Sequence, residues 1–255
     1  MQRTPFLTKQ FRIFRVMLHT LLGVLLAALV LPILNNHAGP RLIRWWCKHL
    51  LRCFNIQVRT YGQLPEDTTQ RTMFVANHIS WADIHAINSI IPVRFIAKME
   101  IKEWPIFGYL VKKSGTLFIN RTLRKDAARI VHMTAEALKQ DENVCFFPEG
   151  TTSEGTHVLP FKSSIVQAAI TAQATVWPIA IYYPKLDKQP NLTMAYAGDT
   201  SMITSMLNIF SIKHPVVELH FLTPIASAQH TRQSITQLAH SMIVQQHQLL
   251  LPASD

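Results

Sequence analysis

The feature that most constrains this chain is a long apolar run near its N-terminus. Residues 16 to 34, VMLHTLLGVLLAALVLPIL, form a stretch of 19 residues in which His19 is the one polar interruption. As a helix rising ~1.5 Å per residue, this run roughly matches the hydrocarbon thickness of a bilayer. The alternative is a cleaved signal peptide, whose apolar region is about 7 to 15 residues long and ends at a small-residue cleavage site. The run is longer and the NNHAGP that follows is a poor cleavage site, so we expect a membrane-associated helix.

Positive charge is concentrated in the same part of the chain. The first 60 residues contain nine Lys or Arg and no Asp or Glu, and the first acidic residue is Glu66. The remaining residues carry 16 basic and 15 acidic side chains, so the body of the protein is near neutral. A basic N-terminus on a neutral body is typical of a protein that meets an anionic phospholipid surface, and it does not favour a nucleic-acid partner.

The next segment, residues 41 to 54, has the pattern of a basic amphipathic helix. Its basic residues recur at spacings of three, four and four and form one stripe: Arg41, Arg44, Lys48 and Arg52. Its apolar area comes from Leu42, Trp45, Trp46, Leu50 and Phe54. Two interpretations are open, a helix lying among lipid headgroups and a core helix whose solvent-facing side is basic. Beside a membrane segment we favour the headgroup interpretation.

We therefore expect a membrane anchor in residues 1 to 55, followed by a second domain in residues 56 to 255. Four basic residues precede the apolar run and four follow it, so the positive-inside rule places both flanks on the cytoplasmic face. Pro32 and the NNHAGP of residues 35 to 40 supply a break at which the chain can reverse. We expect a helical pair that dips into one leaflet and returns. A single spanning helix is the alternative, because the run is long enough to cross.

From about residue 56, short strand-like runs alternate with helical stretches. Runs rich in β-branched and aromatic residues lie at 56–61, 72–76, 93–97, 116–119, 143–147, 174–183 and 216–221. The clearest helical patterns lie at 122–140, 163–174 and 228–250. This alternation predicts an α/β protein whose sheet is covered by helices.

The cysteines and histidines do not have the spacings of a disulfide frame or a metal site. Cys47, Cys53 and Cys145 show no C-x-x-C pattern, which is typical of reduced thiols in a cytosolic compartment. None of the twelve histidines belongs to an H-E-x-x-H pattern. We expect no metal.

A polar cluster follows the strand-like run at 72–76 and contains Asn77, His78, Ser80 and Asp83. His78 and Asp83 are five residues apart, which is about 140° on an ideal helix, so they cannot pair on one helical face. They can pair if His78 lies in the turn before the helix and folds back over its first turn. An aspartate that accepts from one imidazole nitrogen leaves the other basic, so such a pair can remove a proton from an alcohol. The alternative is that Asp83 only caps the helix, in an S-x-x-D start with Ser80.

Three further stretches follow in order along the chain. GTLFINR at 115–121 is a strand that ends in Arg121, FFPEGTTSEG at 146–155 is a strand leading into a glycine turn, and VWPIAI at 176–181 is a strand that contains a proline. With residues 77 to 83, these stretches resemble the four blocks of the glycerolipid acyltransferase family, which includes the 1-acylglycerol-3-phosphate O-acyltransferases. LPFK at 159–162 is also similar to the family's continuation. The resemblance covers roughly residues 70 to 185.

This resemblance implies a fold and a reaction. The fold is a mixed, mostly parallel sheet flanked by helices, with an N-terminal membrane-associated helical pair. The reaction moves a fatty acyl group from acyl-CoA or acyl carrier protein to the free hydroxyl of a lyso-lipid, with no other cofactor, in the manner of a 1-acyl-sn-glycerol-3-phosphate O-acyltransferase. The implied location is a membrane, at the cytoplasmic face of the bacterial inner membrane.

The resemblance also assigns roles to residues. His78 is the base and Asp83 its orienting partner, and no Ser or Cys nucleophile is needed because the alcohol attacks the thioester itself. The acceptor-binding residues are Arg121, Glu149, Gly150, Thr151, Thr152 and Lys162. The guanidinium of Arg121 suits an anionic head group, and a glycine at 150 lets the backbone approach a ligand closely.

One position departs from the family pattern. Many members specific for lysophosphatidic acid carry an Arg where this chain has Thr152, and a threonine offers a neutral hydroxyl instead of a cation. The chain resembles in this respect members that acylate lyso-ornithine lipids or lysophosphodiesters. Two other classes remain as alternatives: a hydrolase in which His78 and Asp83 activate water, and a non-catalytic lipid-binding scaffold. The chain has no G-x-S-x-G nucleophile elbow.

Overall fold

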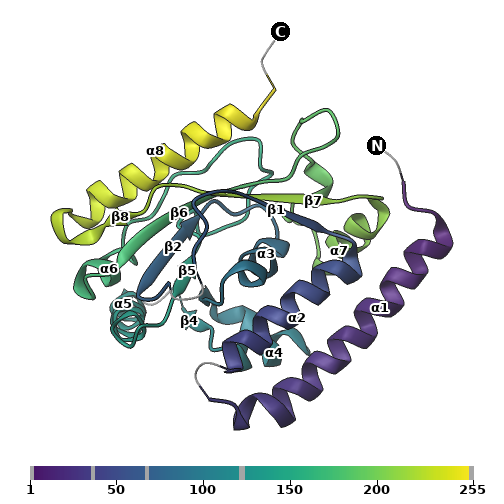
Figure 1. The fold of residues 1–255 in the computed structure, drawn as a ribbon, viewed down its shortest axis with the longest axis horizontal. Helices are drawn as coiled ribbons and strands as arrows, with labels where there is room; N and C mark the ends of the chain where they lie inside the picture. Colours follow the sequence, from purple (N-terminus) through teal and green to yellow (C-terminus); the bar gives the residue numbers. More distant parts are fainter. Residues whose placement is uncertain (1–2, 36–37, 67–68, 121–123, 253–255) are drawn as a thin grey trace.

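A mixed sheet forms the centre of the computed structural model, which describes residues 3–35, 38–66, 69–120 and 124–252. The described part of the chain contains an eight-stranded sheet in the order β1-β7-β6-β2-β5-β3-β4, with β8 paired to β6 (Figure 1). The strands from β6 to β4 run parallel, β7 is antiparallel to β6, and β1 is parallel to β7. The expected mixed, mostly parallel sheet is confirmed.

The strands and helices have the following bounds. The strands are β1 (Gln57–Gly62), β2 (Thr72–Ala76), β3 (Arg94–Lys98), β4 (Leu117–Ile119), β5 (Val144–Phe146), β6 (Thr175–Tyr182), β7 (Val216–Phe221) and β8 (Ile225–Ala226). The α-helices are α1 (Phe6–Leu25), α2 (Ala38–Phe54), α3 (Ala82–Ile90), α4 (Phe107–Lys113), α5 (Arg124–Lys139), α6 (Gln167–Thr171), α7 (Met202–Ser211) and α8 (Arg232–Leu250). Each of the seven expected strand runs forms a strand. Of the expected helices, 163–174 is helical over only five residues.

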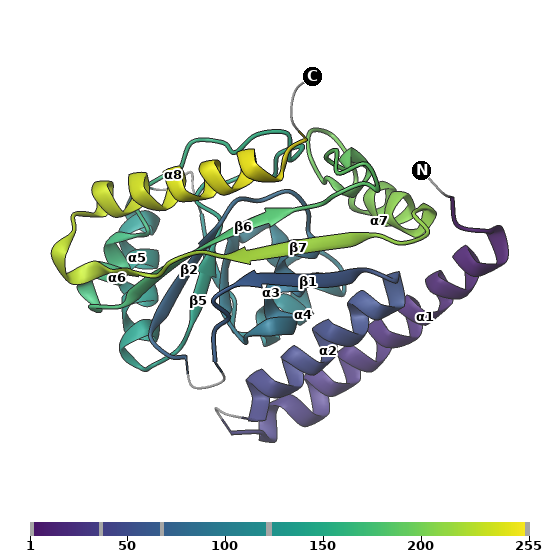
Figure 2. The same cartoon turned by 45° about the horizontal axis from the view of Figure 1, so that its top comes forward.

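Helices cover both faces of the sheet because its inner strands are apolar on both sides. In β2, Phe74 and Ala76 belong to one core cluster and Met73 and Val75 to the other, as the two-residue period of a strand requires. Helices α2, α3 and α7 pack on the first side, and α5, α6 and α8 on the second (Figures 1 and 2). Pro178 fits into central β6 because it falls between the part of β6 that pairs with β8 and the part that pairs with β7.

The N-terminal helices form an antiparallel pair. Helix α1 continues through a π-helical turn (Leu26–Val30) and a 3₁₀ turn (Leu31–Ile33), and α2 then runs back beside it (Figure 2). By length and composition, the helix from Phe6 to Ile33 is long and apolar enough to cross a membrane. Its outward side exposes large apolar side chains: Phe6, Leu7, Phe11, Phe14, Met17, Leu18, Leu21, Leu22, Leu25, Leu29 and Ile33.

Polar contacts fasten α1 to the rest of the protein. Arg12 is buried, and its guanidinium donates to the carbonyls of Ile212 and Lys213 at 2.8 and 2.9 Å. Further along, His19 and Trp46 exchange hydrogen bonds, since each side chain contacts the backbone carbonyl of the other residue. Helix α1 is therefore held against the domain over several turns.

Helix α2 differs from its favoured interpretation. Leu50 and Phe54 are buried in the core that also contains β2 and β7, and Trp46 packs against this core. Trp45 stays partly exposed. The expectation that the apolar side of α2 faces lipid is therefore wrong for Trp46, Leu50 and Phe54, which the core-helix interpretation describes correctly. The exposed apolar face of the helical pair belongs to α1. The division of the chain into a membrane anchor at residues 1 to 55 and a second domain at residues 56 to 255 stays a prediction.

The close approach of the two helices gives a stability prediction. A Cβ added at Gly23 would lie 2.5 Å from Nε1 of Trp46, closer than real contacts allow. Gly23→Ala should therefore lower the free energy of unfolding by about 1–3 kcal/mol, the usual cost of overpacking. Thermal unfolding of the detergent-solubilised protein measures this loss. Gly39→Ala is the control, since its added Cβ meets one leucine methyl at 3.4 Å, and equal stability of the two variants would contradict the prediction.

Candidate active site

The candidate site lies where three neighbouring parallel strands end. Strands β6, β2 and β5 are adjacent in the sheet, and their carboxyl ends lead into Tyr183, His78 and Glu149. In open α/β sheets the crevice outside the carboxyl ends of parallel strands is the usual place for a ligand. Asn77 joins two of these ends, because its side-chain amide donates to the carbonyl of Ile181 and accepts from the N–H of the same residue.

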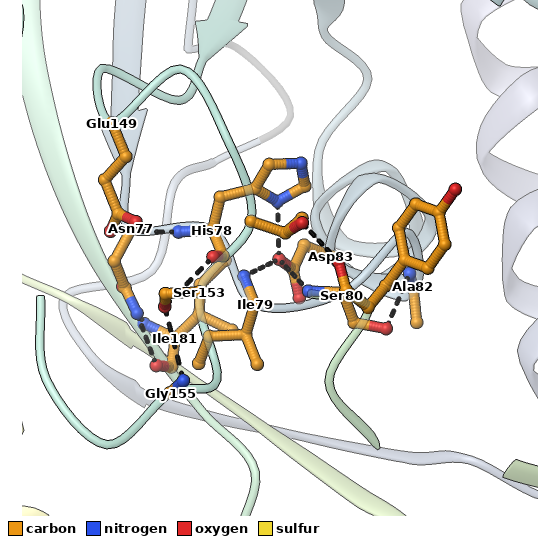
Figure 3. Close-up of polar contacts among 12 residues, drawn as sticks. Asn77, His78, Ile79, Ser80, Ala82, Asp83, Glu149, Ser153, Gly155 and Ile181 are labelled. Carbon is orange, nitrogen blue, oxygen red and sulfur yellow. Dashed lines mark hydrogen bonds and ion pairs between the residues drawn. The ribbon is translucent and has the colours of Figure 1, made fainter. Parts of the chain in front are cut away.

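His78 lies in the turn between β2 and α3 and contacts Asp83 as the sequence predicts. Its Nδ1 is 2.8 Å from Oδ2 of Asp83 (Figure 3). The imidazole stacks on Phe147 with 3.8 Å between ring centroids. The Asp83 side chain is 0% exposed, whereas that of His78 is 17% exposed. Because the ionised carboxylate only accepts, Nδ1 carries the proton and Nε2 is left with a lone pair.

Asp83 also fixes the backbone of the turn. Its Oδ2 accepts from the N–H groups of Ile79 and Ser80 at 2.8 and 2.9 Å (Figure 3). Its Oδ1 accepts from the Tyr183 hydroxyl. Burial, with the adjacent Asp83 carboxylate, raises the pKa of Tyr183 well above its usual value, so the phenol remains a donor. One carboxylate therefore binds both the turn before α3 and the imidazole, and the catalytic role of Asp83 stays a prediction.

The third sequence block packs directly against this turn. The N–H of Ser153 donates to the carbonyl of His78 at 2.8 Å. The Thr152 hydroxyl donates to the carbonyl of Tyr196, whose own N–H donates to the carbonyl of Ile79 at 2.8 Å. Residues 150 to 153 are thus positioned by the same backbone that carries the imidazole.

Glu149 lies behind the turn and is buried, with 4% of its surface exposed. Its Oε1 accepts from the N–H of His78 at 3.3 Å, and its Oε2 has no hydrogen-bond partner among the described residues. Burial is the main cause that raises the pKa of Glu149 to about 8; the charge of Asp83 also raises it, while hydrogen bonds from the backbone N–H groups of His78 and Leu159 lower it. At neutral pH the protonated form of Glu149 therefore predominates.

An apolar cavity of about 580 Å³ opens beside His78. Its wall includes residues of α1, α2, α3, β3 and α4 as well as His78 and Phe147. The lining side chains are mostly aliphatic or aromatic, among them Val16, Leu50 and Phe95. A cavity of this character, with few polar groups, suits an apolar ligand.

The residues expected to bind the acceptor fall in different places. Gly150, Thr151 and Thr152 line the cavity together with His78. Glu149 is buried and Lys162 has an exposed side chain, and neither is among the described residues that line the cavity. Arg121 lies outside the described residues. The acceptor-binding roles of all six stay predictions.

Sequence reasoning missed Tyr183, Tyr196 and the stacking of Phe147 on His78. Tyr183 ends the proline-containing strand that the sequence singles out, and its link to Asp83 depends on β6 lying next to β2. Local patterning does not encode strand order. Tyr196 lies in an irregular segment that carries no motif.

Comparison with known proteins shows which family the chain resembles. A family model described as Acyltransferase matches residues 55–182. A lyso-ornithine lipid O-acyltransferase of Pseudomonas aeruginosa is 32% identical over 80% of this chain and 77% of its own length. A 1-acyl-sn-glycerol-3-phosphate acyltransferase of Neisseria gonorrhoeae is 39% identical over 66% of each chain.

A solved structure shares the fold. The crystal structure of the 1-acyl-sn-glycerophosphate acyltransferase PlsC from Thermotoga maritima superposes with a TM-score of 0.65 at 20% sequence identity. The match covers 96% of this chain and 100% of that one. It includes the N-terminal helices, so the fold extends beyond the four sequence blocks.

The raised pKa of Glu149 predicts how stability depends on pH. Because the folded-state pKa lies above the unfolded value, protonation of Glu149 stabilises the fold at low pH, and this stability is lost as pH rises through about 8. Between about pH 5 and about pH 9 the protein should lose roughly 2–4 kcal/mol of unfolding free energy more than Glu149→Gln does. Denaturant unfolding of both proteins at each pH measures the difference. Parallel pH profiles would mean that Glu149 titrates normally.

Proposed function

The chain belongs to the acyltransferase family, and from this premise we propose that it moves a fatty acyl group from an acyl thioester to the free hydroxyl of a lyso-lipid. The proposed reaction is of the 1-acyl-sn-glycerol-3-phosphate O-acyltransferase type, in phospholipid biosynthesis. Its donor is acyl-CoA or acyl carrier protein, and we expect no further cofactor.

One observation carries the proposal: Nδ1 of His78 is bound to buried Asp83, and the imidazole lies at the wall of an apolar cavity. In this arrangement Nε2 accepts the proton of the acceptor hydroxyl as its oxygen attacks the thioester carbon. The carboxylate of Asp83 stabilises the imidazolium that forms. The thiolate then leaves, taking a proton from the imidazolium or from water, and the apolar cavity holds an acyl chain.

A second acceptor, a lyso-ornithine lipid, is favoured by the geometry of Thr152. Its hydroxyl donates to the carbonyl of Tyr196, so this cavity-lining position offers an acceptor no cation. A phosphomonoester carries a double negative charge, which a guanidinium pairs with and a neutral side chain does not. Relatives of both acceptor types match the chain.

We further propose that the enzyme works at the cytoplasmic face of the bacterial inner membrane, with α1 in one leaflet. The outward side of α1 is apolar over its length, and its inward side is bound to the domain through Arg12, His19 and Gly23. A helix bound in this way lies along the protein, so its exposed apolar side enters the interface without leaving the domain. This arrangement brings the cavity to the level of membrane lipids.

A panel of lyso-lipid acceptors with one acyl thioester, read by product mass, tests the proposal. Acylated product that forms only when a lyso-lipid is present supports it. Equal thioester loss without acceptor would instead establish a hydrolase, and no thioester loss by the membrane-reconstituted protein would establish a binding scaffold.

His78→Ala should reduce acyl transfer by at least ~10²-fold, the usual contribution of a general base. Among the described residues, two imidazoles line the cavity, those of His78 and His85, and it is His78 that is hydrogen-bonded to a carboxylate, whereas His85 contacts the thiol of Cys47. Product mass at saturating acceptor measures the rate, and thermal unfolding confirms that the variant folds. His157→Ala, which removes an exposed imidazole beyond the third block, is the matched control. Near-normal transfer by folded His78→Ala would refute the assignment.

Thr152→Arg should raise the preference for lysophosphatidic acid over lyso-ornithine lipid, by about 1–3 kcal/mol in the ratio of kcat/KM values, because it adds a charge-assisted contact at the cavity wall. Competition between the two acceptors in one assay measures the ratio. Thr156→Arg is the control, since Thr156 is exposed nearby and does not line the cavity. An equal shift in both variants would show that the added charge acts at long range, not at position 152.

A further inference from the structure

The segment from Met99 to Lys113, called here the 99–113 segment, has an unusual outer surface. It comprises a 3₁₀ helix, η3 (Met99–Glu103), a connecting turn and α4, which packs against both η3 and α1. Between the two helices, Ile106 is 56% exposed, and Tyr109 of α4 is also exposed. A large apolar side chain therefore projects from the protein beside the apolar helix α1.

The backbone holds Ile106 in a strained conformation. Its φ is 62° and its ψ is −56°, in a region that β-branched residues rarely adopt and that costs of order 1–3 kcal/mol. The turn is fixed on both sides, since the N–H of Gly108 donates to the carbonyl of Trp104 at 2.8 Å. A Cβ at Gly108 would also lie 2.2 Å from the carbonyl oxygen of Lys102, so η3 and α4 approach closely. Such strain persists only where the surroundings impose it, and here it holds an exposed isoleucine outward.

The exposed charges of the segment include more lysines than acids. Lys102, Lys112 and Lys113 are exposed, against the two exposed acids Glu100 and Glu103. Lys113 also lines the cavity, whereas Lys102 and Lys112 do not. The ammonium of Lys113 lies over the ring of Tyr109, 5.8 Å from its centroid. Tyrosine, lysine and an exposed aliphatic side chain are the residues that lie together at the boundary between lipid headgroups and acyl chains.

The inner side of the same segment faces the cavity. Ile101, Trp104, Phe107 and Leu110 line it, and α1 lines it from another side. The 99–113 segment is thus a wall between the apolar cavity and the outside. A lipid in contact with the outer surface of this segment is therefore separated from the cavity by the segment itself.

We propose that the 99–113 segment is a second membrane contact, in which Ile106 enters the interface of an anionic bilayer beside α1, and Lys102 and Lys112 bind lipid headgroups. This contact rests on one part of the proposed function, the placement of α1 in the membrane, and does not depend on the proposed reaction. Helix α4 of the segment packs against α1, which carries the exposed apolar face, and the exposed lysines of the segment are complementary to anionic lipid. In this contact the wall of the cavity lies against the bilayer. A lipid acyl chain then moves between the membrane and the site without entering water.

Site-directed labelling tests this contact in the full-length enzyme. Ile106→Cys is labelled with an environment-sensitive fluorophore, and the native thiols Cys47, Cys53 and Cys145 are buried. The control is Leu249→Cys on α8, which covers the opposite face of the sheet and where Leu249 is 74% exposed (Figure 1). On vesicles of phosphatidylcholine with phosphatidylglycerol, the label at 106 should shift to the blue and be quenched by spin-labelled lipids, while the label at 249 should do neither.

A label at 106 that stays aqueous while the enzyme floats with the vesicles would overturn the second contact and leave the proposed reaction and the role of α1 untouched. Failure of the enzyme to bind vesicles would overturn the contact together with the proposed membrane location. A blue shift that grows with protein concentration in the absence of vesicles would assign the surface to a second copy of the chain, against the proposal.

The charge component has its own variant, Lys102→Ala with Lys112→Ala, neither of which lines the cavity. Each lysine near an anionic surface contributes about a fivefold gain in binding, so the double variant should bind phosphatidylglycerol vesicles about tenfold or more weakly. Transfer to a monomeric, water-soluble lyso-lipid should be unchanged. Binding that is unaltered on anionic vesicles would overturn the role of the lysines.

Discussion

The carboxylate of Asp83 holds together the turn on which the candidate chemistry depends. It is fully buried and accepts from four donors: the imidazole of His78, the backbone N–H groups of Ile79 and Ser80, and the hydroxyl of Tyr183. A buried charge is tolerated only when it is satisfied in this way. The same four contacts set the path of the chain after β2, the direction of the imidazole and the nitrogen that carries its proton.

The arrangement of the sheet explains how distant parts of the chain meet at this carboxylate. Because β6, β2 and β5 are parallel neighbours, the residues that follow each of them lie at one edge. Tyr183 approaches Asp83 from one side, and Phe147 stacks on His78 from the other. The helices α1 and α2 close the apolar cavity on the same side of the sheet, so that one structure joins a proton acceptor to a space for an acyl chain.

Patterning in the sequence predicts what is local and fails where the answer depends on packing. Runs of β-branched and aromatic residues predict seven of the strands correctly, and the spacing of His78 and Asp83 predicts that they pair only if His78 lies in the turn before the helix, as it does. The sequence pattern does not predict α7, and it does not predict that the apolar side of α2 is buried in the core. Both depend on which faces of the elements meet in the folded chain. The position of Glu149 behind the turn, and the contact of Tyr183, depend on strand order, which a single sequence does not encode.

The most direct test of this account is the rate and stability of Asp83→Asn. The amide oxygen of asparagine can accept from the imidazole and the two backbone N–H groups, and its NH₂ can face the oxygen of Tyr183, so the fold should be retained. It carries no negative charge to stabilise an imidazolium. We therefore predict an unfolding temperature close to that of the native protein with acyl transfer reduced at least ~10²-fold. A variant that unfolds more easily yet transfers at the native rate per folded molecule would show that Asp83 is only a helix cap.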